Sequence, residues 1–91
     1  MTTFATPPLS QTWTEIADGA DVAAILIQLR DESPAHIFVG ADAPAASTEH
    51  YFTLRRTAFP GAAFEPLAEE KVWARSATSV AATLEADRRA R

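Results

Sequence analysis

The stretch KVWARSATSVAATLE, from Lys71 to Glu85, has the clearest structural pattern in this chain. Val72 and Ala74 alternate with Lys71, Trp73 and Arg75, which is the period of two expected for a half-buried strand. The same alternation returns from Val80 to Glu85, where Val80, Ala82 and Leu84 share one face. Ser76 to Ser79 supply a polar turn between them. The stretch therefore predicts two short strands that form a hairpin.

Similar patterns occur through the rest of the chain. Short strands are predicted at residues 12–17, 35–40 and 49–57. The segment 21–30 (DVAAILIQLR) is also compatible with a helix capped by Asp21, but it is short and rich in Ile and Val, which favours a strand. Turn signals recur every eight to twelve residues. We therefore expect an all-β fold: a small antiparallel β-sandwich or barrel of about six to eight short strands.

Two dipeptides mark the expected chain reversals. Asp18-Gly19 is a turn pair in which a residue often takes a positive φ, and Pro60-Gly61 is a type II turn signal. Phe59 and Phe64 bracket the second turn, and we expect both rings to fold back onto the core. Residues 41–48 (ADAPAAST) lack large apolar side chains and predict an exposed loop.

The two ends of the chain differ in composition from the middle. Residues 1–11 contain Pro7 and Pro8, which favour an extended N-terminal arm. This arm is either a frayed terminus or a segment exchanged with a neighbouring subunit through Phe4 and Leu9. Residues 87–91 form a charged tail, expected to be coil or one helical turn. The β-sandwich domain is accordingly assigned to residues 12–86.

Length and composition exclude several classes of protein. At 91 residues the chain is a single domain with little stability to spare, so support from neighbouring subunits is expected. It has no cysteine, which excludes disulfides and thiolate chemistry. A net charge of −4 argues against direct nucleic-acid binding, and the longest apolar run, residues 22–27, is too short to span a membrane.

No residue pattern indicates catalysis. His36 and His50 are the only histidines. With Asp42, Glu49 or Asp31 they would offer nitrogen and oxygen ligands, but their spacing matches no metal motif. No serine lies in a glycine-flanked elbow, and three glycines do not provide a phosphate-binding loop. We therefore expect a protein that is not an enzyme and that has no metal or other cofactor.

Aromatic and arginine residues suggest a surface for recognition. Trp73 and Arg75 share a strand face, and Tyr51 lies near Arg55 on another predicted strand. Such a surface would suit sugars, bases or an acidic protein. In the competing interpretation, Trp73 and Trp13 fill the core and the arginines lie along its rim.

The order of these segments resembles small β-sandwich structural proteins of tailed bacteriophage virions, which decorate heads or form the base of head fibres and spikes. The resemblance covers most of residues 12–85. It is carried by Trp13 in TWTEIADG, by ADAP at residues 41–44 after a strand, and by VWAR at residues 72–75 before the last strand.

The resemblance implies a non-catalytic protein that binds a symmetric shell as a homo-oligomer, with a trimer as one arrangement. Its partners would be copies of itself and the major capsid or another virion protein. Its location would be the virion, assembled in the bacterial cytoplasm. Recognition of a glycan or another ligand through the aromatic and arginine surface is the alternative function. The partner-binding candidates are Trp73, Arg75, Tyr51, Arg55, Phe4 and Leu9.

Overall fold

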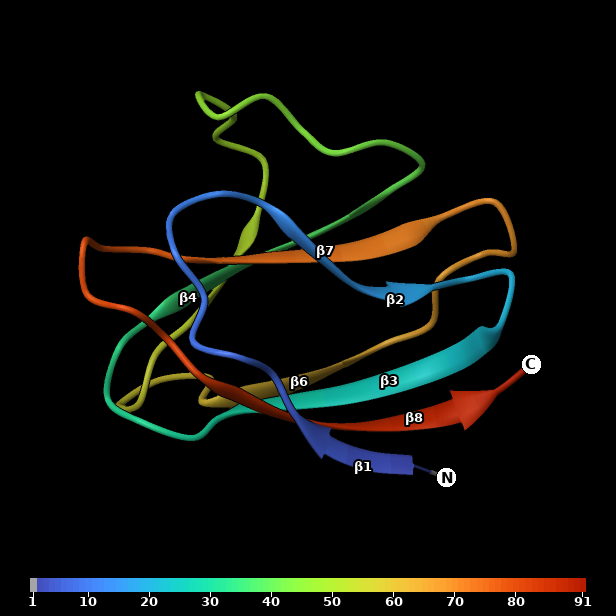
Figure 1. The fold of residues 1–91 in the computed structure, drawn as a ribbon, viewed down its shortest axis with the longest axis horizontal. Helices are drawn as coiled ribbons and strands as arrows, with labels where there is room; N and C mark the ends of the chain where they lie inside the picture. Colours follow the sequence, from blue (N-terminus) through green and yellow to red (C-terminus); the bar gives the residue numbers. More distant parts are fainter. Residues whose placement is uncertain (1) are drawn as a thin grey trace.

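The computed structural model describes residues 2–91, which form two four-stranded antiparallel sheets packed face to face (Figure 1). This range contains eight strands and no helix. The all-β class predicted from the sequence is therefore confirmed. Of the two architectures expected, sandwich and barrel, the chain adopts the sandwich.

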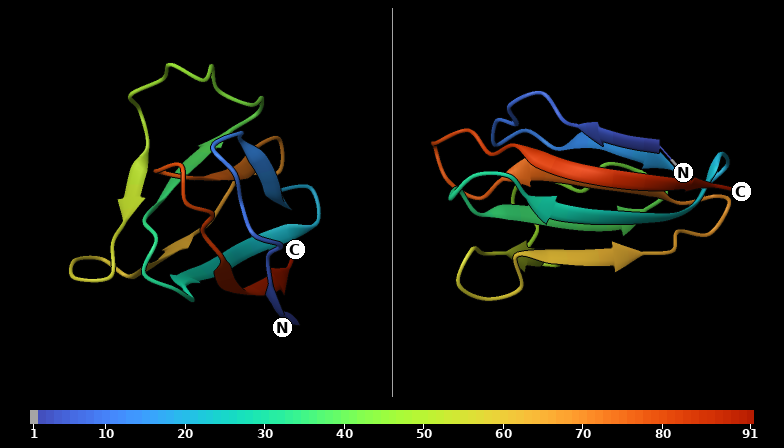
Figure 2. Two further views of the ribbon diagram at one scale, coloured as in Figure 1. Left: turned by 60° about the vertical axis from the view of Figure 1, so that its left-hand side comes forward. Right: turned by 90° about the horizontal axis from the view of Figure 1, so that it is seen from below.

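Each sheet draws its strands from distant parts of the chain. The first sheet has the order β1-β8-β3-β6, and the right panel of Figure 2 shows these strands side by side. Its strands are β1 (Thr2–Ala5), β8 (Leu84–Ala90), β3 (Val22–Leu29) and β6 (Gly61–Phe64). The second sheet has the order β2-β7-β4-β5. Its strands are β2 (Thr14–Asp18), β7 (Lys71–Ser76), β4 (Ala35–Gly40) and β5 (Phe52–Leu54).

Alternating side chains from both sheets make one core. Ile25 and Ile27 point inward from β3, and Ile37 and Val72 point inward from the second sheet; all four side chains are almost completely buried. Face-to-face packing of two sheets requires inward apolar positions on both, which the period-two pattern of these strands supplies. The core is therefore the direct consequence of the alternation in the sequence.

The predicted hairpin between residues 71 and 85 is wrong, although its first strand is correct. Residues 71–76 form β7, but the next strand begins at Leu84 and belongs to the other sheet. Between them the Ser76 hydroxyl donates to the carbonyls of Thr78 and Val80, and Val80 is exposed. Alternation shows which side chains of a strand face the core. It does not show which sheet the strand joins, because strands of both sheets point alternate residues into the same core.

The same crossing occurs through most of the chain. Only the β4–β5 connection joins two strands of one sheet, and every other connection within the described residues passes between sheets. The Asp18-Gly19 turn thus reverses the chain but leads from β2 into the opposite sheet. The strand prediction for residues 21–30 is confirmed by β3, and residues 35–40 form β4 with the predicted bounds.

Residues 49–64 differ most from expectation. The strand predicted at 49–57 shrinks to the three residues of β5, and β6 begins at Gly61, which was expected in a turn. The chain reverses earlier, where Arg55 and Ala58 exchange backbone hydrogen bonds of 3.2 Å. Phe64 is buried as expected, whereas Phe59 is exposed and does not contact the core as predicted.

Both ends of the chain contain strand. In the N-terminal arm, residues 2–5 form β1, which pairs with β8 of the same chain. The C-terminal residues, expected to be coil or a helical turn, instead continue β8 to Ala90. Arg91 follows this strand and donates from its guanidinium to the backbone carbonyls of Gly19, Val22 and Pro66. It therefore ties the end of the chain to two turns.

Gly19 is required here for close approach of two backbone segments. No glycine in the described residues has a positive φ, so the left-handed conformation expected for this turn is absent. Instead, the Gly19 N–H donates to the Glu70 carbonyl at 2.7 Å. A Cβ at this position would overlap the carbonyl oxygen of Leu67. Backbone atoms cannot move aside as a flexible side chain can, so only glycine fits.

Replacing Gly19 with alanine should therefore destabilise the fold. We expect Gly19→Ala to lower the free energy of unfolding by about 2 kcal/mol, measured by urea denaturation. Gly40→Ala is the matched control, because the atoms nearest to its new Cβ belong to the ring of Phe38, a side chain and not backbone. Its cost should be smaller. Equal costs for the two variants would contradict the backbone explanation.

Candidate functional site

An aromatic and cationic layer covers the outer face of the β2-β7-β4-β5 sheet, opposite the core. We call it the outer cluster. Its members contact one another through ring stacking, cation–π contacts, hydrogen bonds or cross-strand pairing, and they are Trp13, His36, Phe38, Tyr51, Trp73 and Arg75.

Strand alternation and register place these side chains together. On β7, Val72 and Ala74 point into the core, so Trp73 and Arg75 point outward. On β4, inward Ile37 separates the outward His36 and Phe38 in the same way. The β4–β7 register then sets His36 opposite Arg75 and Phe38 opposite Trp73. Side chains opposite each other on one face of a sheet are near neighbours, so the cluster follows from this register.

Arg75 is the centre of the cluster. Its guanidinium carbon lies 4.3 Å from the ring centroid of Trp13 and 5.6 Å from that of Tyr51. Its Nε donates to His36 Nδ1 at 3.1 Å, and its Nη1 donates to the carbonyl of Ala46 at 2.9 Å. The residue is only 9% exposed. Arg75 is thus a nearly buried cation held between aromatic rings.

The contact with Arg75 fixes the state of His36. Because Nδ1 accepts a hydrogen bond from a permanently charged guanidinium, the imidazole is neutral and carries its proton on Nε2. Its ring stacks on Tyr51, with centroids 3.7 Å apart. Burial lowers the pKa of His36 below its ordinary value, and the positive charges of Arg75 and then Arg55 lower it further.

The two tryptophans differ in position and burial, since Trp73 lies on the central strand β7 and Trp13 directly precedes the edge strand β2. Trp73 is half-buried, and its Nε1 donates to the Gly40 carbonyl at 3.2 Å. Trp13 is more buried and contacts His36, Phe38 and Arg75. The buried Nε1 of Trp13 has no hydrogen-bond partner among residues 2–91. Neither tryptophan belongs to the main core, so the interpretation in which both fill it is wrong.

The loop 41–51 closes over this layer. Figure 1 shows it at the top, beyond β4 and β7 and away from the first sheet. Its Ala46 carbonyl binds Arg75, and Tyr51, at its end, stacks on His36. The exposed loop predicted from composition is therefore present and is anchored by the outer cluster.

The structure separates the remaining predicted partner-binding residues from this cluster. Arg55 lies at the end of β5, beside the turn it forms with Ala58. Phe4 is half-buried in β1, and the guanidinium carbon of Arg88 lies 4.0 Å from its ring centroid. Leu9 is a core residue and forms an isolated bridge with Ala82. Of the six predicted residues, only Trp73, Arg75 and Tyr51 come together.

Trp13, His36 and Phe38 belong to the cluster but were not among the predicted partner-binding residues. The alternation at residues 35–40 did place His36 and Phe38 on one face, opposite Ile37. Their proximity to Arg75 depends on the pairing of β4 with β7, two strands separated by 30 residues of sequence. The alternation within one strand does not show which residues of another strand lie opposite it.

The described residues contain no group of three or more His, Cys, Asp or Glu side chains placed to hold a metal ion. Residues 2–91 likewise contain no helix that is long and apolar enough to cross a membrane.

The protein is a small antiparallel β-sandwich with an additional layer of aromatic and cationic side chains, the outer cluster, on the outer face of one sheet. No family model, curated protein or solved structure matches the chain.

The His36–Arg75 contact predicts a specific pH dependence of stability. Because the folded pKa of His36 is lowered, its contribution is fully present above the unfolded pKa of about 6.5 and is lost as pH falls through the folded pKa. His36→Asn retains a side-chain acceptor but does not titrate. Denaturation between pH 5 and 8 should therefore show a smaller loss of stability toward acid in the variant.

His50→Asn provides the matched control. His50 is exposed, and its hydrogen bond to the Thr48 hydroxyl comes from its backbone N–H. This variant should keep the wild-type profile. If His36→Asn instead followed the wild-type profile, the acid sensitivity would arise elsewhere in the protein.

Proposed function

We propose that this chain is a non-enzymatic structural protein that assembles with copies of itself through the side of the sandwich formed by β5 and β6. We further propose that it serves in the virion of a tailed phage, as a capsid decoration or head-fibre base module that binds the major capsid or another virion protein. The virion part rests on the resemblance of residues 12–85 described above. The mode of assembly rests on the structure of this side.

The conformation of Phe59 is the observation that carries the assembly proposal. Its φ is 52°, in the left-handed region that bulky residues rarely adopt. Its side chain is also 78% exposed, so burial in the single chain does not offset the strain. Its backbone carbonyl accepts from the Arg55 N–H at 3.2 Å and helps to close the turn, but its exposed ring has no evident role in its own chain. A bulky residue in such a strained conformation points to a function. Contact with another protein would give the ring the burial that it lacks.

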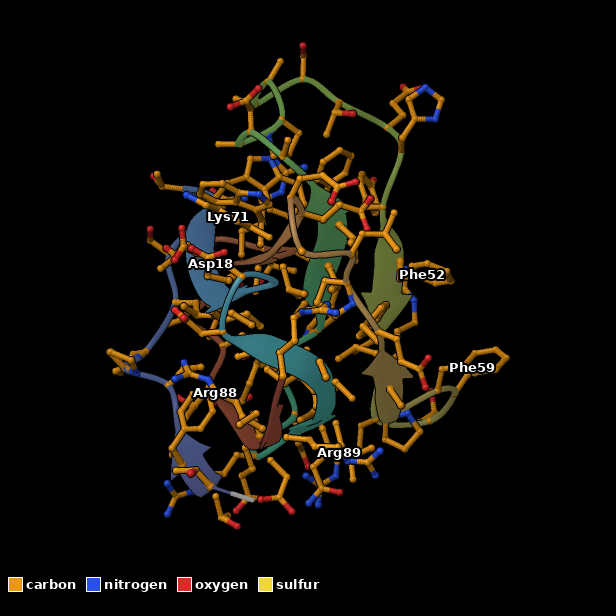
Figure 3. All side chains as sticks on the ribbon, turned by 90° about the vertical axis from the view of Figure 1, so that its right-hand side faces the viewer. Asp18, Phe52, Phe59, Lys71, Arg88 and Arg89 are labelled. Carbon is orange, nitrogen blue, oxygen red and sulfur yellow. The ribbon has the colours of Figure 1, made fainter. Side chains whose placement is uncertain are left out.

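A second exposed ring lies on the same side. Phe52 in β5 is 65% exposed and packs edge-on against Phe64 of β6, with centroids 5.6 Å apart. Figure 3 shows Phe52 and Phe59 projecting from one side, away from Asp18 and Lys71 on the other. Large exposed apolar side chains that gather on one side are typical of protein contact sites.

The backbone of β6 is open on this side. The Leu29 N–H donates to the Pro60 carbonyl at 2.8 Å, so these residues form a hydrogen-bonded pair. Such pairs alternate along antiparallel strands, and the next residue of β6 that bonds to β3 is Ala62. The N–H and C=O groups of Gly61 and Ala63 therefore point away from the sheet. They are available to pair with another strand.

The other sheet edges have features that limit pairing. β2 carries a bulge between Glu15 and Ala17, and Glu15 forms an ion pair of 3.2 Å with Lys71. β5 has only three residues, and the chain turns back directly after it. β1 leads into Pro7 and Pro8, and its one aromatic ring packs under Arg88. Bulges, charges and short length are the usual protections of a strand edge.

Small side chains on β6 make pairing between copies sterically simple. The strand reads Gly61, Ala62, Ala63, Phe64 and carries no charge. Two copies related by a two-fold axis at Ala62 would set Gly61 of one copy opposite Ala63 of the other. The first sheets would then become one continuous eight-stranded sheet. A trimer, the one arrangement named in the sequence analysis, would need a different contact, with β6 against another edge of the next copy.

The alternative function, recognition of a glycan or other ligand, has less free surface in its favour. One face of Tyr51 stacks on His36, and Arg75 is only 9% exposed. Trp73→Ala in a folded protein, probed on a glycan array, tests it. Loss of specific wild-type hits would support ligand recognition, and an array without hits would remove it.

Proline at position 63 should prevent assembly but preserve the domain. Ala63→Pro removes an N–H that points to solvent, so the free energy of unfolding should change by less than roughly 1 kcal/mol. The wild type should form oligomers in analytical ultracentrifugation, whereas the variant should sediment as a monomer. Phe59→Asn, which removes the ring and suits the left-handed conformation, should also weaken association.

Ala62→Pro is the matched control, because its N–H bonds to β3. That variant should lose about 3 kcal/mol of stability. A strictly monomeric wild type would overturn the assembly proposal, and persistent oligomers in Ala63→Pro would overturn the role of β6.

The virion part has its own test. The purified protein, mixed with phage capsids that lack it, should sediment with the particles at a saturating, repeated stoichiometry. If the protein forms oligomers but stays in the supernatant, the virion assignment is wrong and self-assembly stands.

A further inference from the structure

Arg75 carries a positive charge that no acidic side chain in residues 2–91 pairs with directly. It forms no ion pair, since the one ion pair among the described residues joins Lys71 to Glu15. Burying a cation is costly unless hydrogen bonds and an opposite charge compensate it. Aromatic rings, a carbonyl and a neutral imidazole stabilise Arg75 in part, but none of them carries a negative charge.

The guanidinium keeps free donors in a fixed orientation. Of its five N–H groups, one on Nε and one on Nη1 are used by His36 and Ala46. No described residue accepts a hydrogen bond from its other nitrogen, Nη2, and this atom is not completely buried. Because the rings of Trp13 and Tyr51 already restrain the side chain, a ligand would lose little affinity to ordering it.

An opening at the surface is lined in part by Arg75. It has a volume of about 300 Å³, and its lining contains no acidic residue. The lining residues are Gln11, His36, Ala46, Arg75, Ser76 and Ala77. The lining therefore contains one cation and no anion to pair with it.

We propose that the opening beside Arg75 binds a carboxylate group, which pairs with the free edge of the guanidinium. A carboxylate matches the planar fork of arginine with two parallel hydrogen bonds and supplies the single negative charge that is missing. Phosphate sites generally gather several cationic groups, whereas one guanidinium lines this opening. The group comes from an acidic side chain, a chain terminus or a small organic acid. The inference does not depend on the assembly proposal.

Titration with sodium acetate at pH 7.5 tests this site. The Nε–H resonance of Arg75 should shift and saturate, whereas sodium chloride at equal ionic strength should give no saturation. Two peptides separate the sources: N-acetyl-Gly-Glu-Gly-amide offers a side-chain carboxylate and N-acetyl-Gly-Gly-Gly a terminal one. Tighter binding of either peptide than of acetate identifies a protein ligand. Acetate binding at least as tight identifies a small acid.

Gln11→Glu is the decisive variant, because it places a carboxylate of the chain itself in the opening. It should raise the melting temperature and abolish the saturable response to acetate. Gln11→Ala should keep the response. Leu26→Glu adds the same charge to the opposite sheet and should also keep it.

Either of two results would overturn the proposal. In the first, acetate causes no saturable shift of the Arg75 Nε–H resonance in the wild type. In the second, the Gln11→Glu variant binds acetate like the wild type. The titration should give the same result on Ala63→Pro, since the site is complete within one chain, and loss of binding there would contradict that statement. None of these variants requires replacement of Arg75, so the test does not depend on a protein that fails to fold.

Discussion

Two sheets that share one core are the constraint on which the rest of this structure depends. Neither four-stranded sheet can bury an apolar face alone, so Ile25 and Ile27 on one sheet require Ile37 and Val72 on the other. The chain meets this requirement by crossing between the sheets at nearly every connection. Each local element therefore depends on partners far away in sequence. Such a fold forms through non-local contacts, and a 91-residue chain of this kind has few alternatives for stabilising itself.

The outer cluster adds a second, smaller layer to the second sheet. β4 and β7 lie in the middle of that sheet and are covered on both faces, by the core and by Trp13, Phe38, Trp73 and Arg75. Placing a cation in this layer carries a desolvation cost that an aliphatic side chain would avoid. The cation fixes the neutral form of His36 and anchors the loop 41–51. It also leaves the positive charge that would attract a carboxylate.

The sequence predicted the elements better than their pairing. Residues 22–29 and 35–40 became strands because alternating or continuous Ile, Val and Ala leave little choice once a core forms. The hairpin predicted for residues 71–85 is wrong because two consecutive strands have the same alternating sequence pattern in either arrangement. They can pair within one sheet or lie in opposite sheets across the core. β6 was missed because Pro60-Gly61 has the composition of a turn and the four residues of GAAF are too few for a pattern. For the cluster, the shared face of Trp73 and Arg75 was predictable, but the positions of Trp13 and Phe38 beside Arg75 were not.

The sequence by itself determined the all-β class, the inward and outward faces of the central strands, and the absence of cysteine chemistry, because composition and a period of two are local properties. Only the tertiary structure decided which sheet each strand joins, that Arg75 is buried beside a neutral His36, and that Phe59 is exposed in a left-handed conformation. These features depend on register and packing between residues far apart in the chain. A side chain's neighbours across a sheet are set by strand pairing, which no single stretch of sequence contains.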